Sequence, residues 1–161
     1  MVDKISLTKK TLIRDAQRFL DIRPIIVKEA DSLSTIAKSV IMNPKIFNVY
    51  VTDKEDKLIG IIPLEMIYQN IFYPMMSDEL AEGEAAGESG FMEGQIVIAK
   101  DIMVAPVYVK ADDTVKDAFL RMHENKLEEL PIVNDRLKVT GCITIQHLLN
   151  IWLLSHFWTK R

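Results

Sequence analysis

The second half of this chain repeats the first at a spacing of about 82 residues, and this repeat limits the possible folds more than any other feature. The segment 24–60 aligns with the segment 106–141, and the second copy has one residue fewer in a turn. The identical positions are Pro24/Pro106, Val27/Val109, Lys28/Lys110, Asp31/Asp113, Asn43/Asn125, Val51/Val133, Asp53/Asp135, Lys57/Lys138, Gly60/Gly141 and Ile62/Ile143. Such a repeat predicts two similar units packed about a pseudo-twofold axis. An axis of this kind creates two nearly equivalent crevices, which are natural places for a ligand.

Composition and charge narrow the class of protein. The chain has 161 residues, 48% of them apolar, so a core can form in one compact domain or in two small units that share it. The net charge of −3 argues against a nucleic-acid-binding protein, which needs a basic face. The single cysteine, Cys142, excludes an internal disulfide framework, and no secretory signal pattern opens the chain. We therefore expect a cytoplasmic protein that binds no nucleic acid.

The spacing of apolar residues predicts the same order of elements in both copies: strand, helix, strand, strand, helix. The expected strands are 25–27, 49–51, 58–62, 107–109, 130–133 and 139–143. The expected helices are 8–20, 33–41, 64–72, 115–122 and 145–158, the first of which precedes both copies. The predicted fold class is α+β, with two β-α-β-β-α units.

These elements divide the chain into four parts, which are an N-terminal helix (1–21), a first unit (22–76), a linker (77–98) and a second unit (99–161). The linker is rich in Glu, Gly, Ala and Ser, and an acidic, glycine-rich run is usually a solvated, mobile connection. A lid or a partner-binding loop is the alternative interpretation.

The best candidate motif lies where the last strand of each copy meets the last helix. In the second copy, Gly141 lets the chain or a ligand approach closely, and Thr144 stands where a helix N-cap is needed. The free N–H groups of that helical turn can hold a phosphate, although a threonine at a helix start is a cap whether or not anything binds. Elsewhere the sequence shows no nucleophile triad, no phosphate loop and no paired carboxylates, so we expect no enzymatic activity. His123 lacks further metal ligands at suitable spacing, and Cys142 is expected to be a packed thiol.

The order of elements, the Leu130-Pro131-Ile132-Val133 strand and the closing Gly-apolar-apolar-Thr motif resemble the cystathionine-β-synthase (CBS) domain family. Asp101-Ile102-Met103 before Ala105-Pro106 is similar to the usual beginning of such a domain. The resemblance covers roughly 22–72 and 99–158. It implies a tandem regulatory module whose two inter-domain clefts bind adenosine-containing ligands, and which commonly forms homodimers.

The two copies depart from the family pattern to different degrees. In the family an acidic residue three places after the Thr holds the ribose hydroxyls, because a carboxylate accepts two hydrogen bonds at once. Here that position is His147, and in the first copy Pro63 and Met66 replace the Thr and the acid. Glu65 is one place early and points about 100° away on an ideal helix. The first cleft is therefore expected to be empty or apolar.

The second copy accordingly supplies the candidate site. The resemblance places its walls at Val104, Pro106, Tyr108, Leu130, Pro131, Ile132, Thr144 and His147. Tyr108 could stack on a base, although an aromatic residue in a strand is more often part of the core. No cofactor is required, and the possible ligands are AMP, ADP, ATP or S-adenosylmethionine. The expected function is a non-catalytic sensor that passes its state to an unknown effector protein. The alternative is a structural module for homodimerisation or protein interaction that has lost ligand binding.

The C-terminal helix is apolar on nearly every side, with Asn150, Ser155 and His156 as its few polar residues. At about 11 residues its apolar stretch is too short to span a bilayer, so no stable membrane insertion is expected. Such a helix must be covered on more than one side. A homodimer through the helix that contains Trp152 is the expected cover. Membrane-surface contact and burial by the N-terminal helix are the alternatives.

Overall fold

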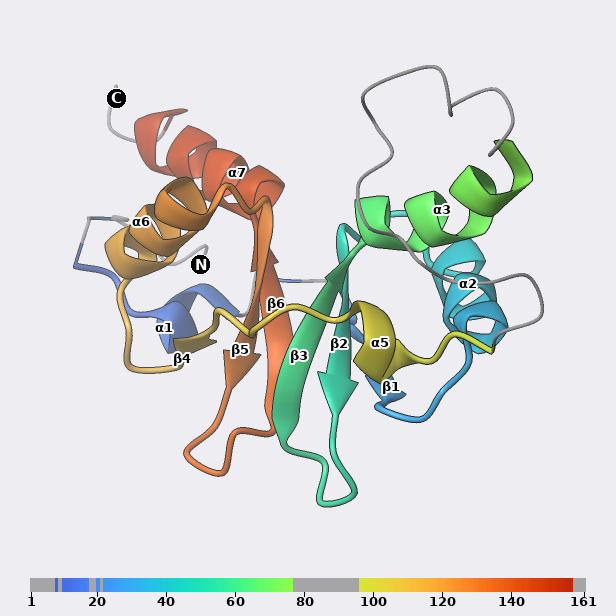
Figure 1. The fold of residues 1–161 in the computed structure, drawn as a ribbon. Coiled ribbons are helices and arrows are strands. Elements are labelled where there is room, and N and C mark those ends of the chain that lie inside the picture. The colour runs from blue at the N-terminus through green and yellow to red at the C-terminus, as the bar shows by residue number, and fades with distance from the viewer. Residues whose placement is uncertain (1–7, 9, 18–19, 21, 77–95, 158–161) are drawn as a thin grey trace. The chain divides into compact units, whose positions relative to one another are not determined.

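The computed structural model describes residues 8, 10–17, 20, 22–76 and 96–157 (Figure 1). The chain divides into two compact units, each described by itself. The first-repeat unit consists of Ile25–Glu55 and Ile59–Ala105, and the second-repeat unit of Met1–Pro24, Asp56–Leu58 and Pro106–Arg161. Each unit carries one three-stranded sheet, which confirms two repeated α+β units.

The first-repeat unit follows the predicted order of strand, helix, strand, strand, helix. Its elements are β1 (Ile25–Lys28), α2 (Leu33–Ile41), β2 (Asn48–Thr52), β3 (Leu58–Pro63), α3 (Leu64–Phe72), the 3-10 turn η2 (Tyr73–Met76) and α5 (Ala99–Ile102). Strand β1 runs parallel to the central strand β2 over four residue pairs. Helix α2 begins as predicted, because the Ser32 side chain accepts a hydrogen bond from the Thr35 N–H.

The second-repeat unit has the same order of elements. These are α1 (Ile13–Ala16), β4 (Val109–Lys110), α6 (Val115–Asn125), β5 (Glu129–Val133), β6 (Val139–Thr144) and α7 (Ile145–Phe157). Strand β5 pairs in parallel with β4 and antiparallel with β6. Thr114 and Asp117 form a capping box that begins α6, because each side chain accepts a hydrogen bond from the backbone of the other.

Strand β4 is shorter than the predicted strand and lies later in the chain. The prediction was 107–109, whereas the structure has only Val109–Lys110. Pro131 stands in β5 at the position of Val49, which in the first-repeat unit pairs with Ile25. A proline has no N–H to donate to a ladder, so β4 loses the pairing that extends β1.

The N-terminal helix is also shorter than predicted. In place of 8–20, helix α1 spans Ile13–Ala16. Leu12 is extended and forms a β-bridge with Thr114, so the helix cannot begin before residue 13. Residues 9, 18 and 19 of the predicted helix, residues 77–95 of the predicted linker, and Trp158 of the predicted C-terminal helix lie outside the described residues.

The segment that leads into each repeat binds to the unit of the other repeat. The Ile13 N–H donates to the Asp113 carbonyl at 2.8 Å, and the Ala99 N–H donates to the Asp31 carbonyl at 2.8 Å. Three further equivalences complete the match, namely the bridges Leu12–Thr114 and Ile98–Ser32, the bonds Arg14 N–Ala111 O and Lys100 N–Glu29 O, and the bonds Val115 N–Thr11 O and Leu33 N–Val97 O. These leading segments, which are the described part of 8–24 and residues 96–105, are therefore structural equivalents over 11–14 and 97–100, and the two repeats exchange them.

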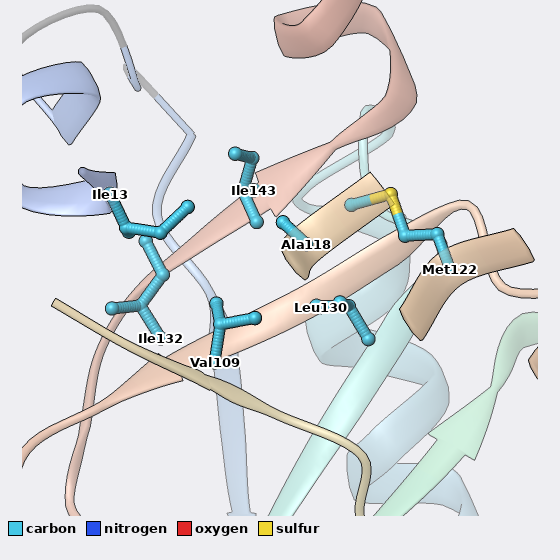
Figure 2. Packing of buried hydrophobic residues seen from close by; sticks show 7 residues of the cluster. All are labelled: Ile13, Val109, Ala118, Met122, Leu130, Ile132 and Ile143. Atoms are coloured by element: carbon cyan, nitrogen blue, oxygen red, sulfur yellow. The ribbon is translucent and has the colours of Figure 1, made fainter. Parts of the chain in front are cut away.

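The core of the second-repeat unit includes a residue from its leading segment. Figure 2 shows the seven buried hydrophobic side chains of this cluster, which are Ile13, Val109, Ala118, Met122, Leu130, Ile132 and Ile143. Leu20 and Leu148 pack against it and are partly buried. Because Ile13 is completely buried, the leading segment is part of the core and does not lie loosely on its surface.

None of the helices in the described part of the chain combines the length and apolarity needed to cross a bilayer.

Candidate functional site

Thr144 and His147 are hydrogen-bonded to each other at the junction of β6 and α7. The His147 N–H donates to Thr144 Oγ1 at 3.2 Å, and the Thr144 N–H donates to His147 Nδ1 at 3.0 Å. Thr144 Oγ1 also lies 3.0 Å from His147 Nδ1. This is a reciprocal cap in which an imidazole takes the place of the usual Glu or Gln. Both residues are buried.

The cap fixes the chemistry of the imidazole. Nδ1 accepts a hydrogen bond from the Thr144 N–H, so it carries no hydrogen of its own, and the neutral ring has its hydrogen on Nε2. A neutral imidazole has one acceptor nitrogen, and here that acceptor is engaged by Thr144. A carboxylate at residue 147 would offer two oxygens, so it could cap the helix and still accept further hydrogen bonds.

The two faces of the β5–β6 ladder separate the predicted site residues. Leu130 and Ile132 point into the core cluster with Val109 and Ile143. Side chains alternate along a strand, so Pro131 belongs to the opposite face. Thr144 shares that face, because it pairs directly with Glu129, two residues before Pro131. The structure therefore places Pro131 and Thr144 on one face, with His147 hydrogen-bonded to Thr144, and it places Leu130 and Ile132 on the opposite face.

The predicted wall residues before β4 belong to two different units. Val104 lies in the first-repeat unit, where it forms a β-bridge with Ile61 and is 45% exposed. Pro106 and Tyr108 belong to the second-repeat unit and are half-buried. Tyr108 immediately precedes β4 and is half-buried, so it is neither a core aromatic nor fully exposed.

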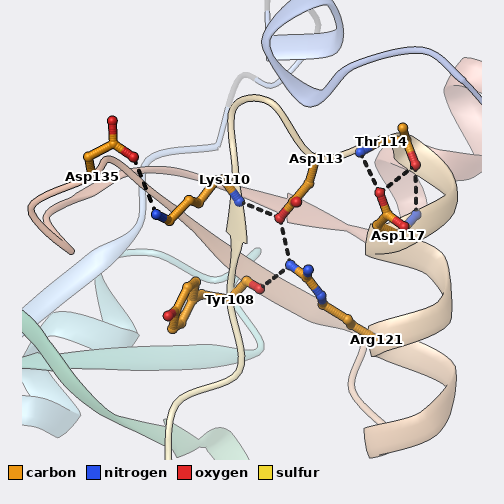
Figure 3. Close-up of polar contacts among 7 residues, drawn as sticks. All are labelled: Tyr108, Lys110, Asp113, Thr114, Asp117, Arg121 and Asp135. Atoms are coloured by element: carbon orange, nitrogen blue, oxygen red, sulfur yellow. Dashed lines mark hydrogen bonds and ion pairs between the residues drawn. The ribbon is translucent and has the colours of Figure 1, made fainter.

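A polar network holds the backbone around Tyr108 (Figure 3). Arg121 Nη1, from α6, donates to the Tyr108 carbonyl at 2.7 Å and to Asp113 Oδ2 at 2.6 Å. Asp113 Oδ2 also accepts the Lys110 N–H at 2.8 Å. Sequence reasoning missed Arg121, because none of the positions between Asp113 and Asn125 is identical in the two copies, so the replacement of Ser39 by Arg121 does not stand out.

The motif of the first-repeat unit has no matching polar cap. Pro63 is the N-cap of α3 and makes no side-chain hydrogen bond there. Met66 is half-buried, and Glu65 accepts a hydrogen bond from Gln69 at 2.9 Å. This junction therefore presents a pyrrolidine ring and a thioether where the other presents a hydroxyl and an imidazole.

Cys142 and His123, the two further side chains considered from the sequence, each contact another residue of the second-repeat unit. Burial, and secondarily the charge of Glu129, raise the pKa of the Cys142 thiol, which donates to the Ile22 carbonyl at 3.7 Å. His123 is stacked on Phe119, with ring centroids 6.1 Å apart. Within the described residues, no three His, Cys, Asp or Glu side chains form a group that could hold a metal ion.

Comparison with known families decides the classification. The family model described as "CBS domain" matches residues 7–72 and 99–153. The chain belongs to the CBS domain family. Each of the two matched segments contains one copy of the repeat. The protein is therefore a tandem CBS pair, as its sequence predicted. The first match begins at residue 7 and therefore includes the leading segment that contains α1.

Among its relatives is the uncharacterised protein MJ1426 of Methanocaldococcus jannaschii, 31% identical over 149 residues that cover 83% of this chain and 86% of that protein. A CBS domain-containing protein of Thermotoga maritima has a TM-score of 0.70, with 22% identity over 96% of this chain and 99% of that one. The CBS pair of protein MJ0100, solved with 5′-methylthioadenosine and S-adenosyl-L-methionine, has a TM-score of 0.61, 22% identity and coverage of 88% and 95%. At these identities the two solved structures show the fold alone.

Proposed function

We propose that this CBS pair is a non-catalytic regulatory module that binds an adenosine-containing ligand through its second repeat. It would work in the cytoplasm and report the bound state to an effector protein. The observation that carries the proposal is the Thr144–His147 junction at the start of α7, with Pro131 on the same sheet face. A CBS pair of the same fold was solved with two adenosine-containing compounds, which supports this class of ligand.

The geometry of His147 limits how such a ligand is held. Family resemblance places the ribose hydroxyls at residue 147, yet the acceptor nitrogen of His147 already receives the Thr144 N–H. The ribose therefore has no acceptor there, and the base and the charged groups of the ligand must supply the affinity. We expect binding that is weaker than in a CBS pair with an acid at this place, and that is insensitive to the 2′-hydroxyl.

Thermal unfolding with AMP, ADP, ATP and S-adenosylmethionine tests the proposal. A ligand at about 100 times its Kd stabilises the folded state by about 2.7 kcal/mol. For a chain of this length that raises Tm by about 5–10 °C, since each kcal/mol is worth about 2–4 °C. An unchanged Tm with all four compounds at millimolar concentration would show that this module does not sense adenosine compounds.

The role given to His147 is tested by comparing AMP with 2′-deoxy-AMP. The parent protein should bind both with nearly equal Kd. His147→Asp should bind AMP more tightly and prefer it over the deoxy compound by about tenfold or more, the effect of a hydrogen bond to a charged group. Met66→Asp is the matched control, because Pro63 supplies no hydroxyl beside it and no preference should appear. A preference for AMP in the parent protein would contradict the role of His147.

A second candidate function, a structural homodimerisation module, is favoured by the surface of the last helix in each repeat. Equivalent positions on α3 and α7 carry exposed apolar side chains, namely Tyr68 (46%) with Leu149 (61%) and Phe72 (52%) with Leu153 (44%). Trp152 on α7 is 56% exposed. Ile151 is buried, so α7 covers the core with one face and leaves a second apolar face exposed. The N-terminal helix contributes Ile13 to the core but does not bury this face.

A second copy of the chain fits this surface, because a twofold interface uses the same patch on both partners. Sedimentation velocity of Trp152→Glu should show a smaller species than the parent protein. Gln146→Glu adds the same charge to an exposed polar position of α7 and should leave the mass unchanged. An identical mass for the parent protein and Trp152→Glu would exclude α7 as the interface.

A further inference from the structure

Strand β4 is the shortest strand of its sheet, and it follows Pro106 and Tyr108, two of the predicted site residues. It pairs with β5 at two positions, whereas β1 pairs with β2 at four. The residues equivalent to Ile25 and Ile26 are Val107 and Tyr108, and both precede β4. The backbone that carries Tyr108 therefore lacks the strand pairing that holds its counterpart in the first repeat.

Arg121 provides hydrogen bonds at the place where this ladder stops. Its Nη1 bonds the carbonyl of Tyr108, the last residue before β4, at 2.7 Å. The same nitrogen bonds Asp113 Oδ2, which in turn accepts the Lys110 N–H from within β4. One guanidinium nitrogen thus joins α6 to the residue before the strand and, through Asp113, to the strand itself (Figure 3).

The first repeat offers an internal comparison. Asp31 accepts the Lys28 N–H at 2.8 Å, as Asp113 accepts that of Lys110. At the position of Arg121, however, stands Ser39, whose hydroxyl donates to the Thr35 carbonyl of its own helix. The aspartate turn is therefore common to both repeats, and the arginine is specific to the repeat in which the strand is shortened.

We propose that Arg121 is a positioning residue, which fixes the segment from Tyr108 to Asp113 and so sets the direction of the Tyr108 side chain. In Figure 3 the Tyr108 ring points away from Arg121, which bonds the backbone carbonyl of Tyr108 and not its ring. The Arg121 and Asp113 side chains are 37% and 27% exposed. Partial burial makes this charge-assisted pair more effective than a fully exposed one. The link to ligand binding rests on the proposed function, whereas the positioning of the segment does not.

Hydrogen exchange measured on the full chain without ligand tests the positioning itself. Arg121→Ser, which copies the first repeat, should raise the exchange rates of the Lys110 and Asp113 amides by about tenfold or more, while α7 amides keep their rates. Arg121→Lys keeps the charge but not the planar fork, so its exchange rates at these amides should lie between those of the parent protein and of Arg121→Ser. Asp113→Asn removes the charge with little change in shape and should reproduce the effect, which covers the case in which Arg121→Ser does not fold.

The matched control is Arg14→Ser, which removes an arginine paired with the exposed Asp112 in the same unit. It should leave the Lys110 and Asp113 amides unchanged. If Arg121→Ser and Asp113→Asn also leave them unchanged, Arg121 is not a positioning residue. AMP titrations separate the two proposals, because Arg121→Ser should weaken AMP binding about tenfold at equal Tm. A parent protein that binds no AMP would overturn the proposed function, and the exchange rates would still decide the role of Arg121.

Discussion

Gly60 and Gly141 occupy equivalent places in the two repeats but have different surroundings, and this difference predicts opposite responses to the same substitution. A Cβ placed on Gly60 would lie 2.8 Å from Met103 Cγ and 2.9 Å from Met103 Cβ, and would also overlap Met103 Sδ. A Cβ on Gly141 would meet Gln17 Nε2 and Ile132 Cδ1 at 3.7 Å, which is ordinary contact. The first site is closed by the leading segment of the second repeat, and the second site has room.

Gly60→Ala should therefore destabilise the protein and Gly141→Ala should not. Forcing a methyl group into a filled site costs about 1–3 kcal/mol. Both substitutions share a stabilising contribution of about 0.4–1 kcal/mol from the restricted unfolded chain. The expected difference between the two variants is therefore about 1–3 kcal/mol, with Gly141→Ala equal to the parent protein or slightly more stable.

Urea unfolding of the two variants measures this difference directly. Met103→Ala removes the Cγ and Sδ atoms that meet the new methyl group but keeps the Cβ, so Gly60→Ala should cost less in that background, with a measurable coupling between the two sites. Equal loss of stability in Gly60→Ala and Gly141→Ala would refute the reasoning. Additivity of Gly60→Ala and Met103→Ala would show that the side chain of Met103 does not fill the site.

Three other predictions concern single side chains. Thr114→Ala should cost about 1 kcal/mol in urea unfolding, more than Ser32→Ala, because the Thr114 hydroxyl donates to the Asp117 carboxylate, whereas the side-chain partners of Ser32 are the neutral hydroxyls of Ser34 and Thr35; a larger loss for Ser32→Ala would contradict this. Hydrogen bonds from the Thr114 backbone and hydroxyl lower the pKa of Asp117, so its carboxylate stabilises the fold above the ordinary carboxyl pKa of about 3.9 and loses this effect as pH falls through the lowered folded-state value. The stability gap between the parent protein and Asp117→Asn should therefore close in acid, and a gap independent of pH would argue against it. Because burial raises the pKa of the Cys142 thiol, it should resist iodoacetamide at pH 8 and react once urea is added; rapid labelling of the folded protein would be the contrary result.

The order of elements could be predicted because it depends on local chemistry. Apolar spacing located the helices and strands of both repeats, and Ser32 and Thr114 cap their helices as their residue types require. The shortening of β4 depends on Pro131, which is separated from it by more than twenty residues. Spacing within the segment 107–109 contains no information about that missing donor.

The exchange of leading segments was missed because the repeat changes its spacing there. The matched residues Leu12-Ile13-Arg14-Asp15 and Ile98-Ala99-Lys100-Asp101 are four residues further apart than the rest of the repeat. An alignment at constant spacing does not bring them together, although both read apolar, apolar, basic, aspartate. Their partners, Asp113 and Asp31, are themselves part of the repeat.

The candidate site could be predicted in its chemistry but not in its geometry. That His147 is a poorer acceptor than a carboxylate follows from the residue type. That its acceptor is engaged by the Thr144 N–H, and that Leu130 and Ile132 face the core, depends on how β6 meets α7 and on the strand register. The residue types of the motif alone do not determine either of these features.

Because the leading segments are exchanged, each repeat of this chain depends on a segment that precedes the other repeat. A fragment that ends before residue 96 would leave the backbone of Asp31 and Ile61 without the partners that Ala99 and Val104 provide. Two such fragments could satisfy one another only by trading segments between molecules, as in a swapped dimer. A substitution in one leading segment is therefore expected to change the stability of the other repeat.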